Sequence, residues 1–377
     1  MFARLVKSFG LLVLALALSA PAARADTYKV GAIMAMTGAA AFYGTVMTRG
    51  AQLAIDEINA AGGINGNKLE LVIEDHKGGK PQPAVSGMNR MINLHNVQAV
   101  LSSFSAPTLA IAPIADEKGV MILNGGGVSA KMIGASKYLF HNRSLATDLA
   151  RALAVRAHER GFERMAQIGI KDEFGDSVIA EASRIWKKLG HTVVATEQYP
   201  QGAINVDTQI AKLRAAKPDV VANWGLTNEA GRIVKRMRDL GMEQPAISME
   251  WGEEAKKAAG GTGDGTEVVS DFFAVTDDNP WGQRFAKAYK DKFGEDPEYY
   301  AANYYENIYV IAELLKRGAP WNGAAMADEL RKNPTFDSVF GGKMTYQPNG
   351  VAIKRVGLFV VENGDRKFVK LTATKVD

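Results

Sequence analysis

Apolar, strand-like stretches alternate with helix-like stretches along nearly the whole chain, and this alternation limits the fold more than any other feature. After Asp26, "YKVGAIMAM" is typical of a buried strand, "TVMTRGAQLAIDEINAAGG" of a helix, and "KLELVIED" of the next strand. Within that helix Met47, Ala51 and Ile55 recur at steps of four on one face. Gly62 begins the glycine pair that should end it. Repeated strand-helix-strand units predict parallel sheets that are covered by helices on both faces.

A second series of alternating elements begins near residue 147 and runs through "RMAQIGI", "HTVVATEQ", "VVANWG" and "AISME". Two similar series predict an α/β chain that folds into two lobes of related construction. The chain closes with "RVGLFVVENGDRKFVKLTATK", where Asn363-Gly364 is typical of a hairpin turn.

The first 25 residues have the order of a secretory signal peptide. Arg4 and Lys7 precede an apolar run from Phe9 to Ala20, and the small-residue tripeptide Ala23-Arg24-Ala25 follows. The alternative is a retained N-terminal anchor, but the apolar run is shorter than the roughly 20 residues that span a bilayer. We therefore expect a cleaved signal peptide over residues 1–25 and a mature protein in the periplasm.

Charge and cysteine content exclude several kinds of function. The net charge of +4 includes three basic residues of the leader, so the mature chain carries 4 − 3 = +1. A nearly neutral chain gives no support for nucleic-acid binding. With no cysteine, the chain has no disulfide, no thiol nucleophile and no thiolate metal site.

The sequence contains no credible catalytic centre. It has no P-loop, no His-Glu-x-x-His pair and no nucleophile elbow, and "GTGDGT" at 261–266 lacks the third glycine of a dinucleotide fingerprint. The five histidines are scattered, which predicts surface or interlobe positions. We expect no enzyme activity, no cofactor and no bound metal.

Small polar residues follow two of the predicted strands. In open parallel sheets, ligands bind beyond the carboxyl ends of strands, where helix N-termini point. "SSFSAPT" at 102–108 is in that position, so the backbone N–H groups of Ser105 and Ala106 and the Ser105 hydroxyl could hold a carboxylate. "NGGGVSAKM" at 124–132 ends the next strand, and its glycines permit close approach to a ligand. The alternative is that both are ordinary turns.

One stretch resembles a known family. "KVGAIMAMTGAAAFYGTVMTRGAQLAIDEINAAGGINGNKLELVIEDHKG" is similar to the opening of type I periplasmic binding proteins of the leucine/isoleucine/valine kind. The similarity continues through "APIADEKGVMIL", "KDEFGDS", "DTQIAKLRAAKPDVV" and "IVKRMRDLG", and so covers essentially the whole mature chain.

The resemblance implies two Rossmann-like lobes joined by three crossovers. It divides the chain into an N-terminal lobe over 26–144 and 275–352 and a C-terminal lobe over 145–274 and 353–377. The lobes would close over a small ligand and deliver it to the permease subunits of an ABC importer.

The resemblance also implies polar contacts for an amino-acid ligand. Ser105 matches the serine that binds the carboxylate, and Val128 stands where a threonine is common, so only its N–H remains for that contact. The Gly126 carbonyl matches an acceptor for the ligand ammonium. Glu250 matches the acid that pairs with the same ammonium. The alternative for Glu250 is a solvated residue at a strand end.

Apolar contacts follow from the same resemblance. Tyr43 and Phe174 match aromatic residues that close over the ligand, and Leu226 stands where a tyrosine is usual. Trp224 and Trp251 lie nearby in the sequence and favour a pocket more apolar than the family pattern. We expect the aromatic run from Tyr299 to Tyr309 to be helix core and surface.

The resulting hypothesis is a monomeric periplasmic receptor that binds a branched-chain or related hydrophobic amino acid between its lobes and hands it to an importer. Alternative ligands on the same fold are an aromatic carboxylate or a small amide. Alternative classes are a ligand-sensing regulator, an exported hydrolase or dehydrogenase, and a structural protein, which the sequence favours less.

Overall fold

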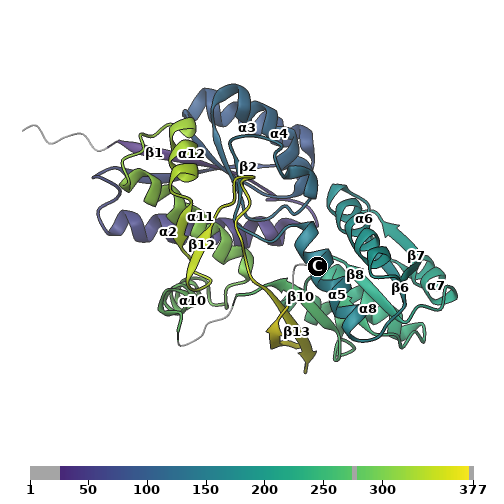
Figure 1. The fold of residues 1–377 in the computed structure, drawn as a ribbon. Coiled ribbons are helices and arrows are strands. Elements are labelled where there is room, and N and C mark those ends of the chain that lie inside the picture. The colour runs from purple at the N-terminus through teal and green to yellow at the C-terminus, as the bar shows by residue number, and fades with distance from the viewer. Residues whose placement is uncertain (1–25, 274–277, 373–377) are drawn as a thin grey trace, which may run out of the picture.

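The computed structural model describes residues 26–273 and 278–372, and the predicted leader over 1–25 lies outside them. Two lobes stand side by side (Figure 1). The first contains a five-stranded parallel sheet of order β2-β1-β3-β4-β5. Its strands are β1 (Thr27–Met34), β2 (Lys68–Asp75), β3 (Ala99–Ser102), β4 (Met121–Asn124) and β5 (Leu139–His141).

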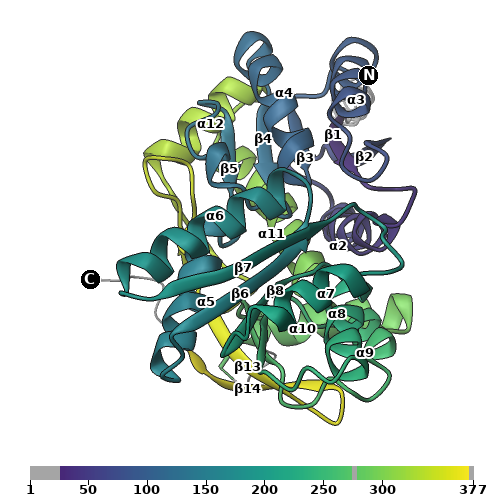
Figure 2. The same ribbon diagram turned by 90° about the vertical axis from the view of Figure 1, so that its right-hand side faces the viewer.

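The second lobe contains a seven-stranded sheet of order β14-β13-β10-β9-β8-β6-β7, in which β13 pairs antiparallel with both β10 and β14 and the other neighbours are parallel. Figure 2 shows its strands β7, β6 and β8 side by side between α5 and α6 on one side and α7 and α8 on the other. Its strands are β6 (Arg164–Ile170), β7 (Thr192–Tyr199), β8 (Val220–Trp224), β9 (Ala246–Ser248), β10 (Glu267–Asp271), β13 (Val356–Glu362) and β14 (Asp365–Leu371).

Helices cover the sheets of both lobes (Figures 1 and 2). Those of the first lobe are α2 (Ala41–Ala60), α3 (Pro81–His95), α4 (Ser105–Lys118), α10 (Pro280–Phe293), α11 (Tyr299–Lys316) and α12 (Gly323–Lys332). Those of the second are α5 (Ala146–Glu159), α6 (Glu173–Lys188), α7 (Asp207–Ala215), α8 (Asn228–Asp239) and α9 (Glu253–Ala259). A 3-10 turn, η1 (Ala130–Met132), follows β4, and a small hairpin joins β11 (Thr335–Asp337) to β12 (Lys343–Thr345).

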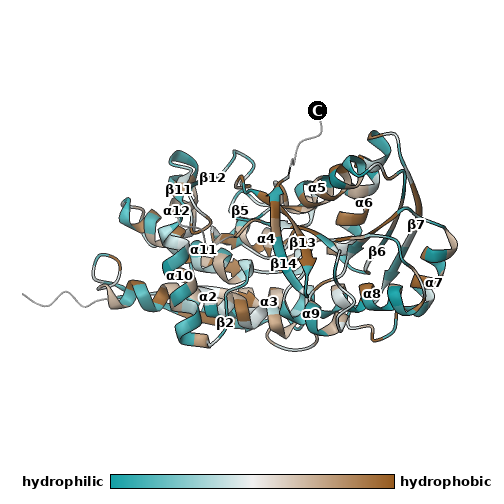
Figure 3. Cartoon of the chain, turned by 90° about the horizontal axis from the view of Figure 1, so that it is seen from below, coloured by the Kyte–Doolittle hydropathy of each residue, from teal (hydrophilic) through white to brown (hydrophobic). Residues whose placement is uncertain are grey.

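The chain passes between the lobes three times, after β5, after β10 and before β13. The α/β architecture with two lobes is therefore as expected. Figure 3 shows brown, apolar residues along the inner strands and mostly teal residues on the outer helices. Among the described residues, no helix is both long and apolar enough to cross a bilayer.

Helix α2 confirms the predicted pattern. Met47, Ala51 and Ile55 are buried along one face, and Gly62 and Gly63 follow the helix with positive φ angles of 100° and 77°. Gly50, on the same helix, is required by packing, because a Cβ there would lie 2.1 Å from the carbonyl oxygen of Ala301 on α11. The close contact holds α11 near the gap between the lobes.

The closing hairpin is also confirmed. β13 and β14 pair antiparallel, and Asn363 and Gly364 connect them with φ angles of 53° and 82°. Two residues with positive φ are the requirement of a type I′ turn, which matches the twist of the flanking strands.

The expectation of surface or interlobe histidines is wrong for His76 and His141, which are both fully buried. His76 Nδ1 accepts from the N–H of Gly79 at 2.9 Å, so Nε2 carries the proton and donates to Ser103 Oγ at 2.9 Å. His141 Nδ1 lies 3.0 Å from Asn124 Nδ2, which can only donate. Burial, which disfavours the charged form, lowers the pKa of each ring to about 4.

These buried rings should make the protein less stable in acid. The unfolded chain binds protons at the ordinary histidine pKa near 6.5, so the stabilisation is complete above about pH 6.5 and is lost as pH falls toward 4. Each ring should contribute a loss of about 2 kcal/mol in unfolding free energy between pH 7.5 and 5. Urea titrations of wild type and His141→Gln should show a shallower pH dependence in the variant. A slope unchanged in His141→Gln, or equally reduced in the control His95→Gln, would contradict the prediction.

Candidate functional site

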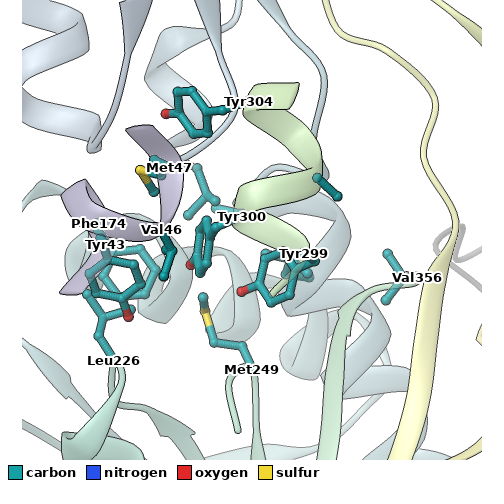
Figure 4. Close-up of a cluster of buried hydrophobic side chains, with 14 of the residues drawn as sticks. Tyr43, Val46, Met47, Phe174, Leu226, Met249, Tyr299, Tyr300, Tyr304 and Val356 are labelled. Carbon is teal, nitrogen blue, oxygen red and sulfur yellow. The ribbon is translucent and has the colours of Figure 1, made fainter. Parts of the chain in front are cut away.

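An apolar pocket lies between the lobes, at the carboxyl ends of their strands, and the closed lobes leave about 20 Å³ of free space in it. Figure 4 shows Tyr43, Met47 and Tyr300 of the first lobe facing Phe174, Leu226 and Met249 of the second. The full lining is Tyr43, Met47, Phe104, Ser105, Gly126, Gly127, Val128, Arg143, Phe174, Leu226, Met249 and Tyr300. Its lining suits a small, largely apolar molecule.

Polar backbone groups gather at the Ser105 side of the pocket. Ser105 begins α4, and the first N–H groups of a helix have no partner within the helix. Its hydroxyl oxygen accepts hydrogen bonds from the N–H groups of Val128 at 3.2 Å and Ser129 at 3.1 Å. Both N–H groups are satisfied by the Ser105 oxygen, which leaves the hydroxyl hydrogen and the first N–H groups of α4 to donate to a carboxylate or another anion.

Two strained residues flank the pocket. Phe104 has φ 63° and ψ 149°, and Thr227 has φ 42° and ψ −122°, although neither is glycine. Phe104 precedes α4 in the first lobe, while Thr227 precedes α8 in the second. Such conformations cost about 1–3 kcal/mol each and cluster at functional sites. The strain aims the Phe104 ring at Tyr43, with centroids 5.6 Å apart and planes at 84°.

The carboxylate of Glu250 is buried and held by hydroxyl groups from the opposite lobe. Oε2 accepts from Tyr43 Oη at 2.5 Å and from the N–H of Thr227 at 3.0 Å. Oε1 accepts from Tyr299 Oη at 3.3 Å and from Tyr300 Oη. Burial, and then the charge of Glu250, raise the pKa of Tyr43 well above its usual value, so its hydroxyl stays protonated and donates.

Arg143 places a buried positive charge at the pocket wall. Its side chain is 1% exposed and its Nε lies 3.3 Å from Asp271 Oδ2. Nη1 donates to the Gly126 carbonyl at 2.7 Å. The guanidinium also lies 5.6 Å and 5.1 Å from the ring centroids of Tyr299 and Tyr300. Because Arg143 lies in the first crossover and Asp271 ends β10, just before the second, the ion pair ties two crossovers together.

The lobes touch each other beside the pocket. The Ser129 hydroxyl donates to Glu173 Oε1 at 2.7 Å, and Lys131 Nζ lies 2.9 Å from Glu173 Oε2. The N–H of Ala130 donates to Ser177 Oγ at 3.0 Å. Glu173 and Ser177 belong to α6 of the second lobe, so these bonds hold the lobes in a closed arrangement.

The structure brings most of the predicted site residues together. Those that line the pocket are Tyr43, Ser105, Gly126, Val128, Phe174 and Leu226. Glu250 lines an adjoining cavity of about 310 Å³ instead. Ala106 and Trp224 are in neither lining, and Trp224 is fully buried with its Nε1 donating to Gln167 Oε1 at 3.1 Å.

Several lining residues were not predicted. Phe104 lies inside the quoted "SSFSAPT" and could have been found from its place between the serines. Tyr300 belongs to the aromatic run expected to be only helix core and surface, and that expectation is wrong for it, because it lines the pocket. Arg143 and Met249 carry no sequence signal that distinguishes them.

A family model and curated relatives match nearly the whole chain. The model described as "Periplasmic binding protein" matches residues 27–366. An "Amino acid binding protein" of Pseudomonas aeruginosa is 31% identical over 316 residues, covering 81% of this chain and 83% of that protein. A "Leu/Ile/Val-binding protein homolog 7" of Brucella abortus is 26% identical over 337 residues, covering 84% of each chain.

Solved structures share the fold. The substrate-binding protein LivJ of Streptococcus pneumoniae, in complex with isoleucine, superposes with a TM-score of 0.84 at 24% identity, covering 92% of this chain and 100% of that one. A solute-binding protein of R. palustris in complex with benzoate superposes with a TM-score of 0.82 at 18% identity, covering 92% and 96%.

These matches confirm the resemblance seen in the sequence and the two-lobed fold of type I periplasmic binding proteins. The family is one of binding proteins that act outside the cytoplasm. The chain belongs to the periplasmic binding protein family.

Proposed function

We propose that the protein is the solute receptor of an ABC importer and binds one small hydrophobic carboxylate between its lobes. Branched-chain amino acids are the first candidates, because curated relatives are named for leucine, isoleucine and valine. The observation that carries the proposal is the interlobe pocket itself, which joins apolar walls from both lobes to the converging N–H groups near Ser105.

In this mechanism the Ser105 hydroxyl, whose oxygen accepts from the Val128 N–H, donates its own hydrogen to the carboxylate. Tyr43, Phe174 and Leu226 enclose the apolar part of the solute. A solute that touches both lobes stabilises the closed arrangement, and the permease recognises that arrangement. No bond of the solute is made or broken.

Several features complete the proposal. The leader over 1–25 is removed on export, and the mature chain acts as a monomer with the permease as its partner. The N-terminal lobe comprises 26–144 and 275–352, and the C-terminal lobe comprises 145–274 and 353–377. The division is supported by the sheets, since β1 to β5 belong to one and β6 to β10, β13 and β14 belong to the other.

Solute-induced closure tests the proposal. The chain has no cysteine, so single cysteines at Lys80 and Ile204, exposed in opposite lobes, can carry a pair of spin labels. Leucine, valine, phenylalanine, benzoate and 4-methylpentanoate are added in turn, with glucose as a neutral polar control. At least one carboxylate should bind one-to-one in calorimetry and shift the label distances toward the shorter, closed population. A panel that neither binds nor changes the distances would overturn the proposal.

A further inference from the structure

Among the described residues, the pocket lining contains a single charged side chain. In the described part of the chain, the lining residues include one guanidinium, that of Arg143, and no carboxylate. Asp271 pairs with Arg143 Nε but is not in this lining; it lines another cavity. Because the guanidinium, and not the Asp271 carboxylate, lines the pocket, this wall favours an anionic solute over a cationic one.

Gly126 offers the carbonyl oxygen nearest to this cation. That oxygen already accepts a hydrogen bond from Arg143 Nη1 at 2.7 Å. An ammonium group bound at the same oxygen would lie beside the guanidinium, and like charges repel strongly in a site without water. The Gly126 carbonyl is therefore a poor acceptor for an amino-acid ammonium.

Glu250 does not replace the Gly126 carbonyl as a partner for a ligand ammonium. A carboxylate has about four lone-pair positions, and the hydroxyls of Tyr43, Tyr299 and Tyr300 with the Thr227 N–H supply four donors. These groups come from the protein, so the buried charge is satisfied without a ligand.

We propose that Arg143 determines specificity and that the solute is a hydrophobic carboxylic acid without an α-amino group. The inference rests on the receptor function proposed above and replaces its first candidates, the branched-chain amino acids, with acids that lack the amine. The carboxylate accepts a hydrogen bond from the Ser105 hydroxyl. The positive charge of Arg143, whose Nη1 is bonded to the Gly126 carbonyl, lies at the same pocket wall and attracts the carboxylate.

Matched pairs of ligands test the inference on the wild-type protein. Leucine is compared with 4-methylpentanoate and phenylalanine with 3-phenylpropanoate, so that each pair differs only by the amino group. Calorimetry should give at least a tenfold lower Kd for the acid without the amine in at least one pair. If leucine or phenylalanine binds and neither pair shows this preference, the inference is overturned and the proposed receptor function stands. If no member of either pair binds, the inference fails, and the receptor function is then decided by the other solutes of the panel.

Variants then test the role of Arg143. The double variant Arg143→Met/Asp271→Asn removes both charges, which avoids leaving Asp271 buried without a partner. Its preference for the acid over the amino acid should fall at least tenfold, while Arg90→Met, which breaks an exposed pair with Glu74, should leave the preference unchanged. Arg143→Lys keeps the charge and should retain part of the preference, which serves as the readout if the double variant does not fold. A preference that is unchanged in Arg143→Met/Asp271→Asn would show that other residues determine specificity. The same conclusion would follow if Arg143→Lys lost the preference as completely as the double variant is expected to.

Discussion

Replacing Lys354 with methionine is expected to lower the free energy of unfolding by about 3–5 kcal/mol, because it leaves a buried carboxylate without its cation. Lys354 Nζ lies 2.5 Å from Glu306 Oε2, and the two side chains are 4% and 0% exposed. Glu306 also accepts from Ser338 Oγ and from Asn142 Nδ2 at 3.1 Å. Glu306 therefore joins α11 to the first and third crossovers. Loss of its ion pair with Lys354 should loosen the hinge between the lobes. Urea unfolding measures the effect.

Two variants serve as controls. Lys343→Met breaks an exposed pair with Asp337 and should cost less than about 1 kcal/mol. Lys354→Met/Glu306→Gln removes both charges and should be more stable than Lys354→Met alone. A single variant as stable as wild type, or a double variant less stable than the single one, would contradict this account of the buried pair.

Local pattern predicts most of the architecture. The apolar face of α2, its glycine ending and the Asn363-Gly364 hairpin depend on residues close in sequence, so periodicity and turn chemistry are sufficient for them. The return of α11 to pack on α2 depends on contacts such as Gly50 with Ala301, which are distant in sequence. Only the family resemblance implied that return.

The site was predictable where it lies at strand ends. Ser105 and Val128 follow β3 and β4, and parallel strands bring their ends to one edge. The surroundings of Glu250 were not predictable, because Tyr43 is 207 residues away and Tyr300 is 50 residues away. No local pattern indicated that three tyrosines share one carboxylate.

Filling the pocket should abolish solute binding without unfolding the protein. Leu226 is 9% exposed and lines the pocket, so Leu226→Trp should place the larger ring between the lobes. The ring and the solute then compete for the same volume. We expect the Kd to rise at least a hundredfold, which is about 2.8 kcal/mol. The cost in stability should stay within the 1–3 kcal/mol typical of overpacking.

Calorimetric titration of wild type, Leu226→Trp and Ile204→Trp tests the central claim most directly, with the tightest of the panel carboxylates as the solute. Ile204 is 87% exposed outside the pocket and provides the matched tryptophan control. The account predicts one solute bound per wild-type chain, the same affinity in Ile204→Trp, and no detectable heat of binding in Leu226→Trp. Wild-type affinity in a folded Leu226→Trp protein would show that the solute does not bind between the lobes at this pocket.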